Sequence, residues 1–385
     1  MKPVVVLLSL AGFGVVALLR LTDPLVPMVS AAFDTTVGRA SIIVTSFAVP
    51  YGLFQLFFGP LGERIGKLLV IALTLTASGV LTMACALAND LPALALLRFL
   101  AGAASAAAVP LSLAYIGDNE PYESRQPVIG FYLQGLIFGQ VLGGLLGGIV
   151  ADTLGWRGLF LVFGGVNTAL GVYLLTHVRA YGDRTSPVPL GLFSTLKAYW
   201  SLLIEKHASG VYVAVAVEGF CVFGVLAFIG AFLRNTQAMN YTTIGLMMAG
   251  FGAGGLIYVR IVRWLVEYVG ERGMILSGGS IIFTAYVLLP MLERWPLIAI
   301  DLFVAGFGFY MMHNTLQTIV TELSPQARGL GVAVFVMMLF AGQGLGVLIL
   351  GAIIDRGGYQ AMFLTAAAIQ AALVIRFRGL PFGNK

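Results

Sequence analysis

Long apolar stretches alternate with short polar segments along the whole chain, and these stretches set the expected architecture. A membrane-spanning helix needs about 20 consecutive, mostly apolar residues. The segments that meet this requirement cover residues 4–29, 41–58, 68–88, 93–116, 127–150, 158–177, 209–233, 242–264, 273–291, 296–320, 328–354 and 361–376. The pattern therefore predicts an all-α integral membrane protein with twelve transmembrane helices.

The composition supports this prediction, because 59% of the residues are hydrophobic, 10% are charged and the mean hydropathy is +0.95. Soluble proteins contain about 25% charged residues. The net charge of +5 does not indicate a nucleic-acid partner here, since the basic residues are spread along the loops. The loops on one side of the predicted membrane contain about three times as many Lys and Arg residues as the loops on the other side. Because cytoplasmic loops are enriched in these residues, we expect both termini in the cytoplasm. The compact loops and the lack of a targeting extension lead us to expect a bacterial inner membrane.

The two halves of the chain resemble each other at an offset of 203 residues. The matches cluster around the fifth and eleventh apolar segments. Gly139, Gln140, Gly143, Gly148 and Asp152 recur as Gly342, Gln343, Gly346, Gly351 and Asp355. The repeat predicts two six-helix domains of the same orientation, over residues 1–177 and 209–385. Residues 178–208 are expected to form a cytoplasmic linker with an interfacial helix.

Five charged residues interrupt segments that are otherwise apolar enough to cross a bilayer: Arg20, Asp23, Arg98, Glu218 and Asp301. They fall on the first, fourth, seventh and tenth helices. An ionisable side chain at membrane depth costs roughly 2.5–3.5 kcal/mol on insertion scales, so it usually faces a water-filled cavity or a partner. Charges on every third helix therefore predict a polar chamber shared by those helices, and transport is the leading hypothesis.

The segment after the second helix reads Gly-Pro-Leu-Gly-Glu-Arg-Ile-Gly-Lys over residues 59–67. Its glycines allow a tight turn, and its charges can engage the end of a neighbouring helix. This order of residues resembles the helix two to three loop of the major facilitator superfamily. The resemblance implies a latch between the halves in the outward-facing state, with Gly59, Glu63, Arg64, Gly66 and Lys67 as gate residues. The family's usual aspartate is Glu63 here and only one residue of its basic cluster remains, which implies a looser latch.

Three further segments resemble motifs of the same superfamily. In helix one, Arg20, Asp23 and Pro24 are similar to the acid and proline pattern of drug:proton antiporters, and in helix four Arg98 is followed by Gly102. The glycines of helices five and eleven either match the antiporter motif or serve close helix packing. These glycines are Gly135, Gly139, Gly143, Gly144, Gly342 and Gly346. The resemblance implies a fold of two pseudo-symmetric six-helix bundles.

Four of the embedded charges are candidates for proton coupling: Asp23, Arg98, Glu218 and Asp301. Arg20 lies three residues before Asp23 on the same helical face and Arg98 is expected to face this acid, so we expect it to stay ionised in at least one state. Glu218 and Asp301 have no base beside them in the sequence, and they either hold a proton near neutral pH or bond to a neighbouring hydroxyl or backbone group. The resemblance instead favours Asp23 as the proton carrier. Arg98 either modulates that acid or is hydrogen-bonded to carbonyls of helix one.

Polar and aromatic residues at membrane depth are candidates for contact with a solute, and ordinary packing is the alternative for each. The candidates are Arg20, Tyr132, Gln134, Tyr310, His313, Asn314 and Gln317. The sequence contains no phosphate-binding loop, no dinucleotide fingerprint and no histidine-acid cluster, so we expect no ATP site, cofactor or metal and no enzymatic activity. The expected partners are a small molecule, protons and the lipid bilayer, with the protein acting as a monomer.

The resulting hypothesis is proton-coupled efflux of a small amphiphilic drug-like molecule or metabolite by alternating access. The embedded charges sum to minus one, from two arginines and three acids, which favours a neutral or cationic solute. The alternative is a symporter or uniporter that imports a small organic anion through the same arginines.

Overall fold

The structure is a computed structural model that describes residues 2–182, 200–203, 206–323 and 328–378, and these residues contain no β-strand. The N-terminal half contains α1 (Pro3–Arg20), η1 (Asp23–Leu25), α2 (Val26–Ala32), α3 (Val37–Ala40), α4 (Ile42–Ile65), α5 (Lys67–Cys85), α6 (Leu91–Ser105), α7 (Ala108–Asn119) and α8 (Tyr122–Tyr181). The C-terminal half contains α10 (Lys206–Glu218), η2 (Gly219–Phe223), α11 (Gly224–Gln237), α12 (Tyr241–Leu288), η3 (Leu289–Met291), α13 (Trp295–Leu323) and α14 (Arg328–Arg378).

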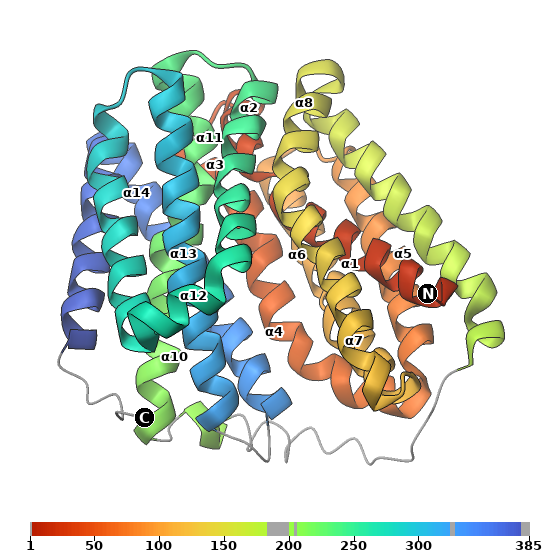
Figure 1. Cartoon of the computed structure of the whole chain (residues 1–385). Coiled ribbons are helices and arrows are strands. Elements are labelled where there is room, and N and C mark those ends of the chain that lie inside the picture. The colour runs from red at the N-terminus through yellow and green to blue at the C-terminus, as the bar shows by residue number, and fades with distance from the viewer. Residues whose placement is uncertain (1, 183–199, 204–205, 324–327, 379–385) are drawn as a thin grey trace.

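Three of these helices are long enough to cross a bilayer twice, and each turns back at a glycine. The turns in α8, α12 and α14 lie at Gly155, Gly270 and Gly358, with φ angles of 69°, 70° and 75° that glycine adopts without steric cost. Nine helices of the described chain are long and apolar enough to span a membrane. Because three of them are such hairpins, they accommodate the twelve predicted passes (Figure 1). The predicted interfacial helix falls largely outside the described residues.

Three of the four predicted pathway helices are interrupted, two of them directly beside a charged residue. The first pass changes from α1 to the short η1 and α2 at Asp23, where Pro24 and Pro27 supply no N–H for an unbroken helix. The fourth pass is divided into α6 and α7. In the seventh pass the π-helical turn η2 begins directly after Glu218. Such wide turns occur often at functional sites.

Glycines bring the same pairs of helices into close contact in both halves. A Cβ added to Gly139 on α8 would lie 2.6 Å from the carbonyl oxygen of Phe13 on α1, so only a glycine fits without displacement. At an offset of 203 residues, Gly342 on α14 makes the same close approach to the carbonyl of Ala216 on α10. The fifth and eleventh passes therefore pack on the first and seventh passes at small residues, as is common in membranes.

The two halves meet at one end of the bundle, the upper end in Figure 1, where α2 and α3 lie; the lower end is where α10 lies. A Cβ on Gly230 of α11 would lie 2.7 Å from Pro24, and one on Gly245 of α12 would lie 2.5 Å from the carbonyl of Gly144. Toward the lower end, a Cβ on Gly59 or Gly130 would have nothing within 4 Å. The closest approaches between the halves thus lie at the upper end, whereas these two glycines toward the lower end face open space.

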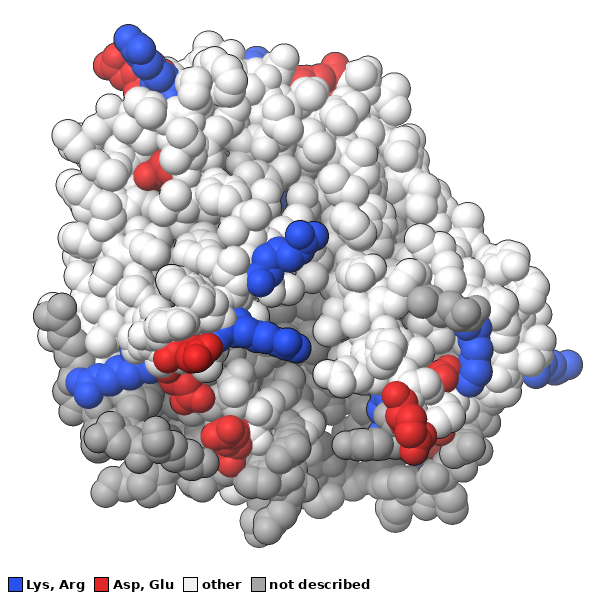
Figure 2. Space-filling view, viewed as in Figure 1, with Lys and Arg blue, Asp and Glu red and all other residues white. Residues whose placement is uncertain are grey.

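The surface agrees with this arrangement. Charged side chains gather toward the two ends, while a broad uncharged band lies between them (Figure 2). The surface is recessed in its lower part between the two halves (Figure 2). Large apolar side chains are exposed on the band, as expected of a surface in contact with lipid; examples are Leu96, Phe138 and Leu246.

Candidate functional site

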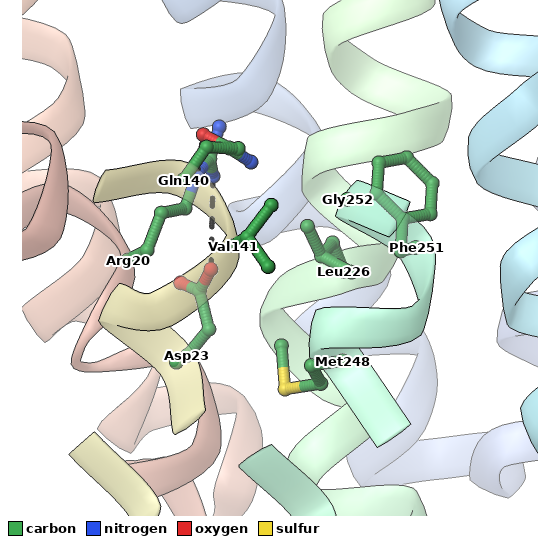
Figure 3. Close-up of a pocket in the computed structure, with 9 residues that line it drawn as sticks. Arg20, Asp23, Gln140, Val141, Leu226, Met248, Phe251 and Gly252 are labelled. Carbon is green, nitrogen blue, oxygen red and sulfur yellow. Dashed lines mark hydrogen bonds and ion pairs between the residues drawn. The ribbon is translucent and has the colours of Figure 1, made fainter. Parts of the chain in front are cut away.

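Arg20 and Asp23 form a buried ion pair at the break in the first pass (Figure 3). Arg20 is the last residue of α1 and Asp23 the first of η1, and the two side chains are separated by 3.6 Å between Nη1 and Oδ2. The Nε of Arg20 donates a hydrogen bond of 2.9 Å to Oε1 of Gln140 on α8. Neither carboxylate oxygen of Asp23 accepts a hydrogen bond from a described residue, although this residue is only 1% exposed.

This pair lies where the two halves meet. A cavity of about 10 Å³ adjoins it, lined by Arg20, Asp23, Gln140, Val141 and Gly144 from one half and by Leu226, Met248, Phe251 and Gly252 from the other (Figure 3). Such a volume holds roughly one water molecule. The Arg20 guanidinium also lies 4.0 Å from the centre of the Phe223 ring of η2. The pair is therefore closed off from any larger solute in this conformation.

Arg98 takes the structural role that was one of its two predicted alternatives. Its guanidinium donates to the carbonyl oxygens of Ile43 at 3.1 Å and Leu18 at 3.3 Å, and to the hydroxyl of Thr22 at 3.2 Å. It is fully buried over the Phe47 ring and forms no ion pair with a described residue. Arg98 therefore ties the fourth pass to the first and second passes. Its guanidinium is not paired with Asp23, whose partner is Arg20.

Replacing Arg98 with leucine is expected to destabilise the protein. The carbonyls of Leu18 and Ile43 would remain buried without this donor, and an unsatisfied buried polar group costs about 1–3 kcal/mol. The thermal unfolding midpoint in detergent would fall. Arg98→Lys, which keeps the charge but has fewer donors, is expected to fall between the wild-type protein and Arg98→Leu. An unchanged midpoint in Arg98→Leu would contradict the structural role.

Glu218 forms a second buried pair of acid and base, in the C-terminal half, which is an ion pair only when the histidine is protonated. Its Oε2 lies 3.0 Å from Nδ1 of His313 on α13, while Oε1 has no described hydrogen-bond partner. The carboxylate is completely buried, whereas the His313 side chain is 15% exposed. The imidazole packs between the rings of Phe309 and Phe335, at centroid distances of 4.9 Å and 5.1 Å. The only described polar partner of this acid is therefore a partly exposed imidazole.

Aromatic side chains join the two pairs across the region where the halves meet, which we call the junction. The Phe223 ring under Arg20 lies 5.2 Å from the ring of Phe309, which stacks on His313. The ion pair of each half is thus connected to that of the other half through two phenylalanine rings. Sequence reasoning missed Phe223, and it noted Gln140 only as a residue that recurs in the repeat.

Asp301 does not join these residues, which corrects the prediction of one chamber shared by all the embedded charges. It lies with Ser277, Ser280 and Thr284 in a separate groove between the second pass of α12 and the start of α13. Its side chain forms no ion pair with a described residue. Without Asp301, the acids near the junction equal the arginines in number, so charge no longer favours a cationic solute.

The remaining solute candidates fall into two groups. Tyr310, His313, Asn314 and Gln317 are partly exposed and share one face of α13, at helical spacings of three, four and seven residues. Gln134 is exposed in a groove of about 410 Å³ between α1 and α8. Tyr132, in contrast, is fully buried in the core of the N-terminal half, where its hydroxyl lies against Gly12. The structure brings only the α13 group to the ion pairs, through His313.

The predicted gate residues interact within the N-terminal half. The Nζ of Lys67 lies 2.8 Å from Oε1 of Glu63 and 2.8 Å from Oδ2 of Asp118, so it joins the ends of α4 and α7. Gly66 makes the turn between α4 and α5 with a φ of 106°. Arg64 is exposed and has no described ion-pair partner. Among the described residues, no ion pair joins this segment to the C-terminal half.

Two aspartates that were not predicted as site residues connect the halves at the upper end. Asp152 on α8 accepts hydrogen bonds from the backbone N–H groups of Tyr241 at 3.1 Å and Thr242 at 2.7 Å, at the start of α12. Asp355 on α14 accepts from the N–H of Gly38 at 3.0 Å and from the hydroxyl of Thr36, at the start of α3.

The two contacts are equivalent in the repeat. Asp355 follows Asp152 by 203 residues, and Tyr241, which donates to Asp152, follows Gly38, which donates to Asp355, by the same number. Each carboxylate caps the positive end of a helix in the opposite half. We call this pair of contacts the aspartate clasps. Their signal was present in the sequence, because the two acids were polar matches within the repeat.

Comparison with known proteins agrees with this architecture. The family profile described as Major Facilitator Superfamily matches residues 8–326 and 211–383. The chain is 25% identical to the uncharacterized MFS-type transporter YwfA of Bacillus subtilis over 90% of this chain and 84% of that protein. It is 26% identical to the probable multidrug resistance protein EmrY of Escherichia coli over 49% of this chain and 37% of that one. A solved bacterial homolog of the human lysosomal transporter Spinster superposes with a TM-score of 0.78, at 17% identity, over 98% of this chain and 97% of that one.

Proposed function

Because the chain belongs to the Major Facilitator Superfamily and is a multi-pass membrane transporter, we propose that it exports a small amphiphilic molecule in exchange for protons. The observation that carries this proposal is the presence of two separate buried ion pairs, one in each half, on either side of the junction. Similarity to EmrY supports export. The solute is neutral or weakly basic, since charges at the junction balance.

The two ion pairs have different tasks in this proposal. Glu218 carries the proton, because Oε1 of this buried carboxyl has no described partner and Oε2 lies against the imidazole of His313, which is partly exposed. Asp23 is a poorer carrier, because the Arg20 guanidinium keeps its proton in proteins and protonation of the acid would leave a buried cation without its counterion. Arg20 and Asp23 instead hold the junction closed and contact the solute once the upper end opens.

Alternating access follows from the separation of the halves at one end only. We take the upper end as the external face and this conformation as inward-facing, with the aspartate clasps keeping the external face closed. A proton on the Glu218 and His313 pair removes one negative charge from the C-terminal side of the junction. That change alters the balance between the two facing states and so couples proton entry to solute exit.

The proposal is tested with purified protein in liposomes under an imposed pH gradient. The probes are tetraphenylphosphonium as a lipophilic cation, chloramphenicol as a neutral amphiphile and benzoate as an organic anion. We expect gradient-driven movement of one of the first two probes, lost when nigericin dissipates the gradient. Transport that ignores the gradient would contradict proton coupling. Uptake of benzoate alone would favour the anion-import alternative.

Arg20 distinguishes the two functions further. In export of a neutral or basic solute, Arg20→Gln is expected to shift the pH profile of transport and to lower its rate by a few-fold, because Asp23 loses its counterion. In anion import the same change would abolish uptake, since the guanidinium would be the binding group. Arg39→Gln, which removes an exposed arginine near the upper end, is the control and is expected to leave both activities unchanged.

A further inference from the structure

Asp301 lies in a groove of about 360 Å³ on the flank of the C-terminal half. The groove runs between the second pass of α12 and the beginning of α13. Two of its apolar lining side chains are exposed, Leu288 at 45% and Val304 at 39%, and Ile300, which precedes Asp301 in the chain, is 59% exposed. Exposed apolar side chains at this level of a membrane protein contact lipid. The groove therefore opens sideways to the bilayer and not to the junction between the halves.

The acid in this groove has no partner within the described part of the chain. Asp301 is only 9% exposed, and its Oδ2 is enclosed without any hydrogen bond. A carboxyl group in contact with hydrocarbon is costly unless a partner satisfies it. The described helices around it supply none, so the groove leaves room for a molecule that offers a donor to this oxygen.

The chemistry of the groove indicates what that molecule must offer. Its three hydroxyls already donate to carbonyl oxygens of their own helix: Ser277 to Gly273 at 2.6 Å, Ser280 to Leu276 at 2.7 Å and Thr284 to Ser280 at 2.9 Å. Each hydroxyl oxygen can then only accept. Together with the Asp301 carboxyl group, the groove presents acceptors along its length and lacks a free donor.

We propose that this groove binds the primary ammonium group of an amphiphile in the adjacent leaflet, such as an aminophospholipid. A primary ammonium carries three donors and no acceptor, which complements a charged acceptor flanked by hydroxyl oxygens. Asp301 lies six residues into α13, about 9 Å along the helix from its exposed first residue, Trp295. Tryptophan is typical of the membrane interface, so a headgroup reaches the acid from there. Ile281, Leu288 and Val304 supply the apolar wall for the attached chain.

The test compares lipids that differ only in their N–H donors. Purified protein is equilibrated in mixed micelles with phosphatidylethanolamine, its N-methyl and N,N-dimethyl forms, or phosphatidylcholine, and bound lipid is counted by native mass spectrometry. We expect retention to fall at each methylation and to be at least fivefold lower for phosphatidylcholine, which has the same charge but no N–H. Equal retention across the series would overturn the proposal without requiring any variant.

Variants then locate the site. Asp301→Asn should remove the preference for the primary amine, whereas Glu267→Gln, which removes an exposed acid three residues before the Gly270 turn of α12, should keep it. Preference retained in Asp301→Asn would place the lipid elsewhere and contradict the proposal. Dodecylamine is added both as a competitor and as a transport probe. It shows whether the ammonium group bound in the groove belongs to a membrane lipid or to a transported solute. Displacement without transport identifies a lipid site, whereas displacement with transport identifies a lateral entry site for solute.

This inference does not depend on the proposed export. If Asp301→Asn loses the lipid preference but keeps gradient-driven transport, the site is separate from the pathway. If transport is absent from the wild-type protein as well, the lipid measurements remain interpretable, because they require no turnover.

Discussion

Replacing Glu218 with glutamine is expected to abolish accumulation of a solute against its own gradient, while downhill exchange of that solute continues. Glutamine keeps the size of the side chain and can still bond to His313, but it cannot take up a proton. The pair in the C-terminal half would then have lost the acid of its ion pair. Uphill transport in liposomes with an imposed pH gradient would fall to the level of protein-free vesicles, a change of more than tenfold.

The control for this variant is Glu322→Gln, which removes an exposed acid near the end of the same helix as His313. It is expected to transport like the wild-type protein. His313→Gln should retain Glu218 as a carrier, and its pH dependence should move, since the base beside the acid is lost. If Glu218→Gln accumulated the solute at the wild-type rate under a pH gradient, this acid would not be the proton carrier. Asp23 would then be the candidate for that role.

Replacing Asp152 and Asp355 together with alanine is expected to open the upper end. The double variant loses both carboxylates of the aspartate clasps, each of which bonds to the start of a helix in the opposite half. Because both carboxylates are exposed, we allow about 1 kcal/mol for each clasp. Loss of both then favours the open state by roughly thirtyfold, since about 1.4 kcal/mol corresponds to a factor of ten.

A reporter cysteine measures this shift. Met248 lines the closed cavity and is 8% exposed, so Met248→Cys, in a background without Cys85 and Cys221, should react slowly with an impermeant maleimide added from outside. The rate should rise about fivefold in each single aspartate variant and roughly thirtyfold in the double variant.

Asp90→Ala is the matched control for the clasps. This aspartate caps α6 by accepting a bond of 2.7 Å from Ala93, and it lies at the same end, but its helix belongs to its own half. Its loss is expected to leave the labelling rate unchanged. If Asp90→Ala raised the rate as much as the double variant did, general loosening of the upper end would explain the result better than separation of the halves.

The sequence predicts the fold well because the signals for spans, hairpins and repeat are local or periodic. Apolar length gives the helices, and the offset of 203 residues relates the two halves. The pairing of Arg20 with Asp23 was also predictable, since the two residues are three apart. The pairing of Glu218 with His313 spans 95 positions in sequence and depends on how two helices face each other. No local pattern contains that information.

The error concerning Asp301 has a simple geometric cause. Charges were assigned to a common chamber by the helix on which they lie, without regard to the face of that helix. Asp301 precedes Tyr310 by nine residues, which is two and a half turns at 3.6 residues per turn. The acid therefore points away from the face that carries Tyr310 and His313. The number of turns between these residues follows from the sequence alone and is enough to place them on opposite faces.

The aspartate clasps were missed for a different reason. Asp152 and Asp355 were noted as repeated residues, but their position at the ends of apolar segments is also typical of ordinary loop residues. Their partners are backbone N–H groups, which leave no trace in side-chain identity. Only the spatial approach of a helix start from the opposite half gives these acids a role.

The wide turn η2 fixes the angular setting of the seventh pass. A π-helical turn contains one residue more than an α-helical turn over the same rise. Glu218 and Phe223 are five residues apart, which in a regular α-helix would set them about 140° from each other. The wide turn absorbs the extra residue, so both side chains come toward one side of the pass and address His313 and Arg20 at once. Deleting one residue between them would restore regular winding without turning the ends of the pass against each other, so related sequences one residue shorter at this point should keep the pairing of acid and ring.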